Sequence, residues 1–406
     1  MTHLPQGWEV KTIENVCKNS NSNLALKDIK DKSGDYPVFG ASGIVGYVDF
    51  FHKAQECLGI IKDGAGVGRV FVLPKQSSVI GTLSYLENNE TTNLKYLFYF
   101  LKNLDFSKYI LGSAIPHIYF RDYKKEQIPL PPLKEQGRIA GILDLAFEKI
   151  DTSTELLKAN LANLDELAKS VLDRAFNPLG DSADSTESTQ NPNTHDAQSP
   201  YPLPQHWEWK SLGEIASVIQ SGFAINKSNE IADGYIHLRT HNIATDGNLN
   251  FETLVKVKKE LIKEQQSFIE EGDILFNNTN STELVGKTAL VTQNYNYAFS
   301  NHITKIKLFN QYSPKLVVFY FVLLLKNKYF ERICHKWIGQ SGINTDKLKQ
   351  IQIPLPKDIK EQKQIAMHLD SVFDKIQKLK ELYNAQLQDY EELKQSLLTQ
   401  AFSGKL

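Results

Sequence analysis

The sequence predicts an α/β fold in which two mixed α/β domains are separated by two long helices. The helices are expected to form an intramolecular antiparallel coiled coil, and the whole chain a pseudo-twofold internal repeat. LPQGWEVKTIENV at 4–16 returns as LPQHWEWKSLGEI at 203–215, and IPLPPLKEQ at 128–136 returns as IPLPKDIKEQ at 353–362. Each copy of the second segment opens a long stretch with an apolar residue at every seventh position, which is typical of a coiled coil.

The repeats divide the 406 residues into five parts. The head returns after 199 residues and the helical segment after 226, so the second domain is about 27 residues longer than the first. Between the halves, 181–200 has two alanines as its only apolar side chains besides proline, too few to offset the entropy of ordering it. The predicted boundaries are 1–132 for the first domain, 133–177 for the first helix, 178–201 for a flexible acidic linker, 202–357 for the second domain and 358–406 for the second helix.

Within each domain, short β-like runs separated by glycine-rich turns precede one apolar helix. A polar loop then leads directly into the IPLP segment. In the first domain the β-like runs are expected within 36–50 and 57–74, the helix at 94–101 and the polar loop at 112–127. In the second domain the β-like runs are expected within 234–243 and 272–291, the helix at 316–325 and the polar loop at 339–352.

Each long helix has a column of apolar side chains seven residues apart, and such a column lies on one face of an α-helix. The companion column is expected three residues later, where Asn160 and Gln386 occupy equivalent positions. Buried amides at these positions would fix the register of the pair at a cost in stability. At about 1.5 Å per residue, the first helix is roughly 60 Å long. The predicted column consists of Leu143, Ile150, Leu157, Leu164, Leu369, Ile376, Tyr383 and Tyr390.

Composition and charge favour a cytoplasmic protein but leave its partners open. The three cysteines, Cys17, Cys57 and Cys334, lie far apart and form no CxxC pair, which suits a reducing compartment. The start MTHLPQGWEV lacks the regions of a signal peptide, and the longest apolar run, at 316–325, is too short to cross a bilayer. The net charge of −1 neither requires nor excludes nucleic acid.

Segments that imitate catalytic motifs are incomplete. VGKT at 285–288 ends like a phosphate-binding loop, but Ser281 occupies the position of its first glycine. GAGVG at 64–68 lacks the wider dinucleotide fingerprint, so a strand turn is expected there. His237 and His241 have the spacing of HExxH without its glutamate. The NPPY-type tetrapeptide of adenine methyltransferases does not occur. We therefore expect no catalytic residue and no metal site.

The order of these motifs resembles the specificity subunit of type I restriction-modification enzymes over essentially the whole chain. The motifs are the LPQGWE head, the GS-type loop, IPLPPLKEQ and a heptad helix ending AFNPLG, after which the cycle repeats and ends AFSGKL. The second copy, IPLPKDIKEQ, departs by one extra residue. In that family each variable middle is a target recognition domain for one half of a split DNA sequence, and the helices fix the gap between the halves.

The resemblance also implies partners and cofactors. The expected partners are double-stranded DNA, two methylation subunits that dock on the helical regions, and restriction subunits; no membrane is expected. The chain itself would be non-catalytic and would hold no cofactor. S-adenosylmethionine would belong to the methylation subunits, and ATP with Mg to the restriction subunits, which carry the motor and the nuclease.

DNA recognition needs polar side chains on exposed loops that face the groove, and Lys or Arg near phosphates. The polar loops of both domains are therefore the expected contact regions, although each single residue has an ordinary solvated side chain or a turn cap as its alternative. The candidates in the first domain are Lys62, Arg69, Ser113, His117, Tyr119, Arg121, Lys124 and Lys125. The candidates in the second domain are Arg239, His241, Asn242, Asn278, Asn280, Lys287, Gln340, Ser341, Asn344 and Lys347.

Two other classes of protein fit parts of the pattern. A non-catalytic coiled-coil scaffold that binds only proteins would keep the heptads and the repeat, but it gives no reason for two dissimilar middles that end in polar, basic loops. An enzyme that acts on nucleotides would need the phosphate-binding loop that Ser281 interrupts.

Overall fold

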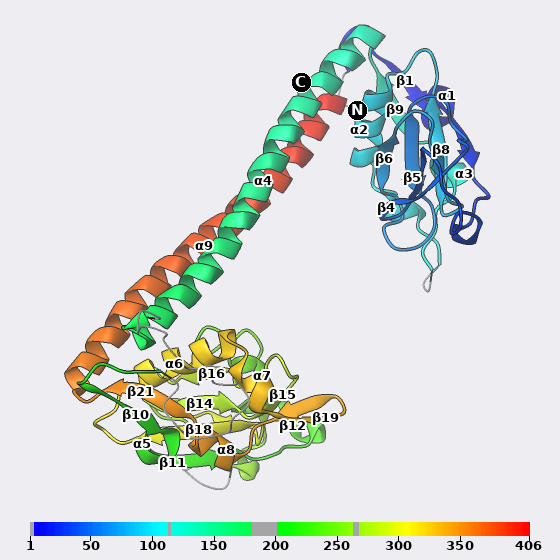
Figure 1. Ribbon diagram of the computed structural model, residues 1–406. Coiled ribbons are helices and arrows are strands. Elements are labelled where there is room, and N and C mark those ends of the chain that lie inside the picture. The colour runs from blue at the N-terminus through cyan, green and yellow to red at the C-terminus, as the bar shows by residue number, and fades with distance from the viewer. Residues whose placement is uncertain (1–3, 113–114, 181–200, 263–267) are drawn as a thin grey trace. The chain divides into compact units, whose positions relative to one another are not determined.

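The chain forms two compact units, each with one mixed α/β domain and one segment of each long helix (Figure 1). One unit consists of Met1–Ala159 and Leu382–Leu406, and the other of Asn160–Glu381. The predicted fold class is thereby confirmed. The computed structural model describes residues 4–112, 115–180, 201–262 and 268–406. Most of the predicted linker, 181–200, lies outside these ranges. No helix of the described ranges is both long and apolar enough to cross a membrane.

Three sheets build the first domain. A two-stranded antiparallel sheet, β1-β9, joins the head of the domain to the strand that enters the first long helix. A four-stranded sheet has the order β2-β8-β5-β6, and a three-stranded sheet has the order β4-β3-β7. The elements are β1 (Glu9–Thr12), α1 (Ile13–Val16), β2 (Cys17–Asn21), β3 (Tyr36–Gly40), β4 (Gly43–Val48), β5 (Cys57–Ile61), β6 (Val70–Leu73), β7 (Ser78–Val79), β8 (Leu83–Asn88), α2 (Leu94–Asn103), α3 (Phe120–Tyr123) and β9 (Gln127–Leu130).

The second domain repeats this topology strand for strand and adds a fourth sheet. Its sheets have the orders β10-β21, β11-β18-β14-β16 and β13-β12-β17, and the additional sheet has the order β15-β20-β19. The elements are β10 (Trp207–Ser211), α5 (Leu212–Ile215), β11 (Ala216–Ser221), β12 (Glu230–Leu238), β13 (Lys256–Val257), β14 (Ile274–Asn277), β15 (Thr279–Asn280), β16 (Thr288–Leu290), β17 (Ala298–Phe299), β18 (Ile303–Leu308), α6 (Pro314–Lys326), α7 (Tyr329–Ile333), β19 (His335–Trp337), β20 (Gln340–Gly342), α8 (Thr345–Lys349) and β21 (Gln352–Pro356).

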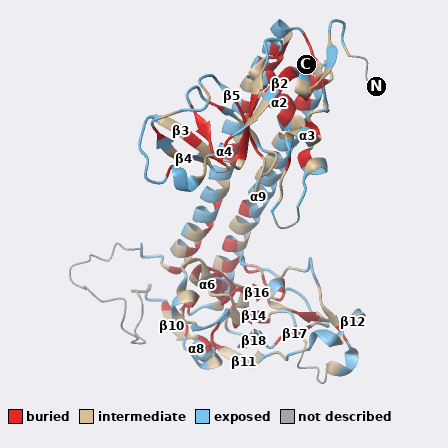
Figure 2. Cartoon of the chain, turned by 90° about the vertical axis from the view of Figure 1, so that its right-hand side faces the viewer, coloured by how far each residue is buried: buried red, intermediate tan, exposed pale blue. Residues whose placement is uncertain are grey.

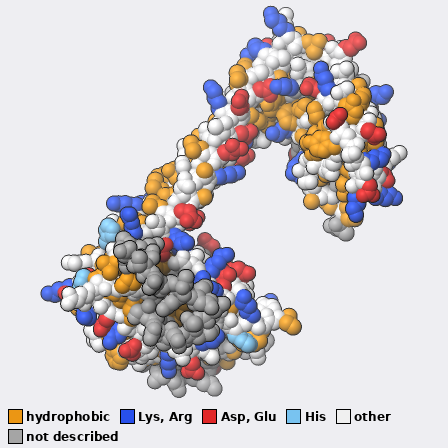
Figure 3. Space-filling model, viewed as in Figure 1, with side chains coloured by type: hydrophobic (Ala, Val, Ile, Leu, Met, Phe, Trp, Pro, Cys, Tyr) orange, Lys and Arg blue, Asp and Glu red, His pale blue; other side chains and the backbone are white. Residues whose placement is uncertain are grey.

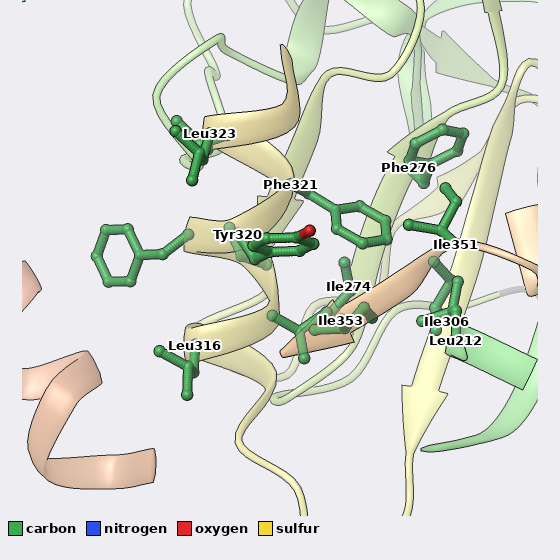
Figure 4. Close-up of a cluster of buried hydrophobic side chains, with 14 of the residues drawn as sticks. Leu212, Ile274, Phe276, Ile306, Leu316, Tyr320, Phe321, Leu323, Ile351 and Ile353 are labelled. Atoms are coloured by element: carbon green, nitrogen blue, oxygen red, sulfur yellow. The ribbon is translucent and has the colours of Figure 1, made fainter. Parts of the chain in front are cut away.

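An apolar helix covers the four-stranded sheet in each domain, as its sequence predicts. In α6, eight consecutive side chains from Leu316 to Leu323 are buried, because the helix is enclosed on more than one face. Phe321 contacts Phe276 of β14 with ring centroids 5.9 Å apart (Figure 4). Side-chain caps define the helix starts: Asn93 accepts a hydrogen bond from the Tyr96 amide, and Ser313 accepts one from the Leu316 amide.

A buried glutamine in each repeated KEQ segment joins the start of a long helix to the domain beside it. In the first unit, Gln136 accepts a hydrogen bond from the Asn93 amide at 2.7 Å and donates to the carbonyls of Thr91 and Pro131. In the second unit, Gln362 accepts from the Ser313 amide at 2.9 Å and donates to the Pro356 carbonyl at 2.8 Å. The repeated motif therefore has a structural role in each unit.

The long helices are α4 (Leu133–Phe176) and α9 (Ile359–Phe402). Their segments run antiparallel within each unit. In the first unit the Lys394 ammonium lies 2.5 Å from the Asp151 carboxylate, and in the second unit Lys380 lies 2.5 Å from Asp165. In the first unit Arg138, near the start of α4, also donates to the carbonyl of Leu406, just after the end of α9, as an antiparallel pair of segments requires.

The predicted apolar column is buried at Leu143, Ile150, Leu157, Leu164, Leu369 and Ile376, while Tyr383 and Tyr390 are half-buried. Figure 2 shows buried residues along both α4 and α9. The prediction for the companion column is wrong by one residue. The seam uses positions four residues after the column, such as Phe147, Thr154 and Ala168, so Gln386 is exposed and Asn160 is half-buried. An apolar column alone does not decide this point, because residues three and four positions later both lie beside it.

Candidate DNA interface

In the first domain, the polar loop is joined to the end of β5. The backbone of His117 bridges to Asp63 and Leu111, and the Ile118 amide donates to the Lys62 carbonyl at 2.9 Å. This pairing places two candidates, Lys62 and His117, beside each other. Ser113 lies outside the described residues.

A small basic and aromatic cluster follows this bridge. The rings of His117 and Tyr119 meet edge to face at 5.2 Å, and the Arg121 guanidinium lies 4.6 Å from the centre of the Tyr119 ring. Tyr119 is 41% exposed, and the Arg121 side chain is 73% exposed. An exposed arginine held over an aromatic ring offers both positive charge and a stacking face, which are the two features that nucleic acid contacts use.

Several basic candidates of this domain have partners within the chain, and Arg121 is one of them, because its guanidinium lies 3.5 Å from the Asp122 carboxylate. Lys124 and Lys125 both pair with Glu14, and the hydrogen bonds from Lys125 and then Lys124 lower the pKa of that carboxyl. Arg69 donates to the carbonyls of Ala41 and Gly66. These side chains are exposed or half-exposed, so a phosphate would have to compete with the groups that hold them now.

In the second domain, the corresponding loop forms the additional sheet. Thr279 and Asn280 of β15 pair with Gly342 and Ser341 of β20, and the Ile343 amide donates to the Asn278 carbonyl at 2.9 Å. This last bond matches the bond between Ile118 and Lys62 in the first domain. Gln340 is exposed and Asn280 is half-buried, so both keep a surface position on this sheet.

Burial excludes four candidates of the second domain from the surface. The exposed fractions are 0% for Asn242, 9% for Asn278, 7% for Lys287 and 1% for Ser341. Asn242 donates to the carbonyls of Asn250 and Thr253, and Asn278 donates to the Asn301 carbonyl and the Thr304 hydroxyl. A polar residue in a turn can be exposed, or it can be buried and make hydrogen bonds to the backbone of that turn. Buried polar groups need hydrogen-bond partners, and these side chains provide them.

Lys287, from the segment that imitates a phosphate-binding loop, donates to the Thr240 carbonyl at 2.8 Å. Burial lowers the pKa of its ammonium group. His237 is also buried, and its Nε2 lies 3.1 Å from the Phe223 carbonyl. Among the described residues, no group of three or more His, Cys, Asp or Glu side chains has an arrangement that could hold a metal ion.

The other candidates of the second domain are held at its surface by contacts within the chain. Arg239 donates to Glu230 at 3.2 Å, and His241 lies 3.1 Å from the Thr253 carbonyl. Asn344 caps α8 by accepting from the Lys347 amide, while the Lys347 ammonium donates to the Ile333 carbonyl. Arg239 and His241 belong to the segment around β12, away in sequence from the additional sheet.

Sequence reasoning missed the hairpin formed by β19 and β20. Lys336, Trp337 and Ile338 are all exposed there. The signal was present in HKWIGQSG, where Gly339, a residue suited to a tight turn, separates HKWI from QSG. The expected loop began only at Gly339, so its first strand was not considered.

The two domains thus share one strand order, and each has a polar, basic loop at the equivalent position. This is the architecture of a protein with two equivalent recognition domains. Comparison with known families agrees. The model of the type I restriction modification DNA specificity domain matches residues 5–162 and again 204–388, and the chain belongs to this family. It is a specificity subunit with two target recognition domains.

Relatives with known names span most of the chain. It is 25% identical to the specificity subunit of type I restriction enzyme MjaVIII from Methanocaldococcus jannaschii, over 99% of this chain and 94% of that protein. It is also 25% identical to the EcoKI specificity subunit of Escherichia coli K12, over 73% of this chain and 61% of that protein.

Two solved structures have the same fold. A chain from a structure of a type I R-M system, described in terms of complex assembly and conformational transition, aligns over the full length of both chains with a TM-score of 0.72 at 18% identity. The crystal structure of an HsdS subunit from Thermoanaerobacter tengcongensis aligns over 99% of this chain and 98% of that chain, with a TM-score of 0.53 at 17% identity.

Proposed function

We propose that each domain of this specificity subunit recognises one half of a bipartite DNA site, and that the long helices set the gap between the halves. The observation that carries the proposal is that the two domains share one topology but have different side chains on their polar loops. Tyr119 and Asn344 are equivalent, since each precedes the short helix α3 or α8. Elsewhere on the two loops the first domain has His117 and Arg121, whereas the second has Gln340. Because side-chain chemistry determines base recognition, two such surfaces fit two different half-sites.

The long helices are proposed to bind the methylation subunits as well. In α4, Leu145 and Leu156 are 63% and 62% exposed. They lie eleven residues apart, about three helical turns, so both belong to one face. Leucines this exposed on a helix that already buries its other apolar face favour a protein partner.

A co-purification experiment tests the docking proposal. Leu156→Glu should reduce the amount of methylation subunit recovered with the chain, because it places a charge in the proposed contact. Glu155→Gln, at the neighbouring exposed position, is the matched control. Equal recovery with Leu156→Glu and the wild-type chain would reject docking on this face.

The chain is not an enzyme by itself, and we propose that it holds no cofactor. S-adenosylmethionine would be bound by the methylation subunits, and ATP with Mg by the restriction subunits of the complex. Double-stranded DNA, two methylation subunits and restriction subunits are the proposed partners, and the cytoplasm is the proposed location.

The decisive experiment is co-expression with the methylation subunit, followed by single-molecule sequencing of the host DNA for modified adenines. A split motif with a fixed gap is the expected result. One continuous motif would mean that only one domain recognises bases. Absence of methylation in an assembled complex with bound cofactor would favour the coiled-coil scaffold instead.

A further inference from the structure

The hairpin of β19 and β20 ends in two exposed apolar side chains. Trp337 is 52% exposed, and Ile338 at the turn is 105% exposed, as much as an isolated residue. Figure 1 shows this hairpin extending beyond the body of the second domain, and Figure 3 shows hydrophobic side chains gathered at its free end. Burial in the folded domain does not account for an apolar tip of this kind.

The tip is held in a defined position. The ring of Trp337 lies over Gly342, where an added Cβ would come within 2.8 Å of the indole, so only glycine fits. The ring of His335 meets Trp337 edge to face at 4.7 Å. Gly339 completes the turn with a φ of +84°, which glycine adopts without strain. Pairing of β20 with β15 then ties the hairpin to the domain. The apolar groups are therefore presented in one geometry before any partner binds.

The charge around the hairpin indicates a polyanionic partner. The hairpin itself, HKWIGQSG at 335–342, contains no acidic residue. The sequence segment 326–349 that contains it has six Lys or Arg residues and two acidic residues, a net charge of +4, in a chain whose net charge is −1. The Glu283 carboxyl interacts with two of these lysines, Lys328 and Lys336, and leaves the region with an excess of positive charge. A basic, hydrogen-bonding frame around an apolar tip matches DNA, in which phosphates flank the grooves.

The first domain has apolar side chains at the corresponding place. Ile110, Leu111 and Ile115 are 38%, 49% and 67% exposed, on the two sides of the loop that His117 closes. Apolar exposure at one point of a shared topology, with different residues in each copy, is expected if the feature serves recognition.

We propose that the hairpin of β19 and β20 enters the major groove of the half-site recognised by the second domain, and that Ile338 contacts the C5 methyl group of a thymine. The inference rests on the proposed function of the chain as a DNA specificity subunit. The major groove admits a two-stranded β-ribbon, and the thymine methyl is the apolar group that it displays. Ile338 is then a specificity-determining residue, with Lys336 and Gln340 placed for polar contacts beside it.

The test uses the complex of the full chain with its methylation subunits and a duplex that contains its mapped site. Each thymine of both half-sites is replaced in turn by deoxyuridine, which removes only the methyl group. Binding of the wild-type complex should weaken about fourfold at one position, the effect of one buried methyl. Ile338→Ser should weaken binding to the thymine duplex at least as much and should bind the thymine and uracil duplexes equally.

Phe309→Ser is the matched control, because Phe309 is 46% exposed in the same domain but lies between β18 and α6. It should keep the wild-type preference for thymine. A wild-type complex that ignores every thymine replacement, or an Ile338→Ser complex that keeps the preference, overturns this inference while leaving sequence-specific binding intact. A complex without preference for any DNA sequence overturns the proposed function and this inference together.

Discussion

At the scale of single residues, the repeated glutamines show how a short motif joins two elements. Gln136 is 0% exposed and Gln362 is 1% exposed, and each makes hydrogen bonds to backbone groups of a neighbouring segment. Without these bonds, the backbone groups would be buried and unpaired, which costs free energy because water cannot reach them. The glutamine therefore fixes where each long helix leaves its domain.

Replacement of Gln136 by Leu should lower the free energy of unfolding of its unit by roughly 2–4 kcal/mol, since three backbone partners lose their bonds. Gln388→Leu is the control, because Gln388 is exposed and donates to Glu392 within its own helix. That variant should stay within about 0.5 kcal/mol of the wild type. Urea denaturation measures both. Similar stabilities of the two variants would show that the buried bonds contribute little.

A buried histidine makes the second domain sensitive to acid. Burial, and then the charge of Arg239, lower the pKa of His237 to about 4 from the ordinary 6.5. Its Nδ1 is buried and has no hydrogen-bond partner among the described residues. As the pH falls below 6.5, the unfolded chain takes up a proton that the folded chain excludes. Stability is thus full above pH 6.5 and is lost progressively toward pH 4.

Between pH 7.5 and pH 5.0, this residue should reduce the free energy of unfolding by about 2 kcal/mol. His237→Gln keeps a donor for the Phe223 carbonyl but does not titrate. Between the same two pH values, the free energy of unfolding of this variant should therefore fall by about 2 kcal/mol less than that of the wild type. His241→Gln, at an exposed site, should behave like the wild type. Urea denaturation at the two pH values decides, and equal acid sensitivity in all three proteins would contradict the assignment to His237.

At the scale of elements, ion pairs mark the register of the long helices. Lys380 and Lys394 occupy positions of the α9 seam, with side chains 27% and 19% exposed, and each reaches an aspartate of α4. Each ammonium remains partly solvated while its stem covers apolar surface. A polar side chain at a seam position favours the one register that provides its partner.

A charge-reversal cycle tests this register in the second unit. Asp165→Lys and Lys380→Glu should each destabilise the helix pair through like charges, and the double variant should recover about 0.5–1 kcal/mol of coupling. Asp165→Lys combined with Lys375→Glu provides the control, because Lys375 is an exposed residue of α9 five positions earlier. Coupling no larger than that of the control would mean that Lys380 does not face Asp165 in solution.

At the scale of the whole molecule, the repeat gives two copies of one recognition scaffold in a single chain. Each copy is followed by its own 44-residue helix, α4 or α9. A helix has a fixed rise per residue, so the number of residues in it is a physical measure of length. This is the basis on which the helices are proposed to determine the gap between half-sites.

The test inserts seven residues into each long helix, between Asp151 and Asp165 in α4 and between Lys380 and Lys394 in α9. Seven residues add about 10.5 Å to a helix, and one base pair occupies about 3.4 Å of DNA. The gap between the half-sites should therefore lengthen by about three base pairs. Both half-sites should stay unchanged. Mapping of modified adenines measures gap and half-sites together. Changed half-sites with an unchanged gap would refute the role of the helices as spacers.

The sequence by itself determined the repeat, the fold class, the position of both long helices and the apolar column of their seam. These features depend on local periodicity and on motifs that recur in the chain, so they are visible without coordinates. The family resemblance follows from the same motifs, because they occur twice in the same order.

Only the tertiary structure decided which polar residues reach the surface. Asn242, Asn278, Lys287 and Ser341 have the same chemistry as surface candidates, yet the fold buries them. Their polar groups bond to other segments of the domain, as when Asn278 donates to the Thr304 hydroxyl and Lys287 to the Thr240 carbonyl. The choice between positions three and four residues after the apolar column likewise depended on the partner helix. The exposed tip at Ile338 emerged only when the β15-β20-β19 sheet formed, since a hairpin is defined by pairing and not by composition.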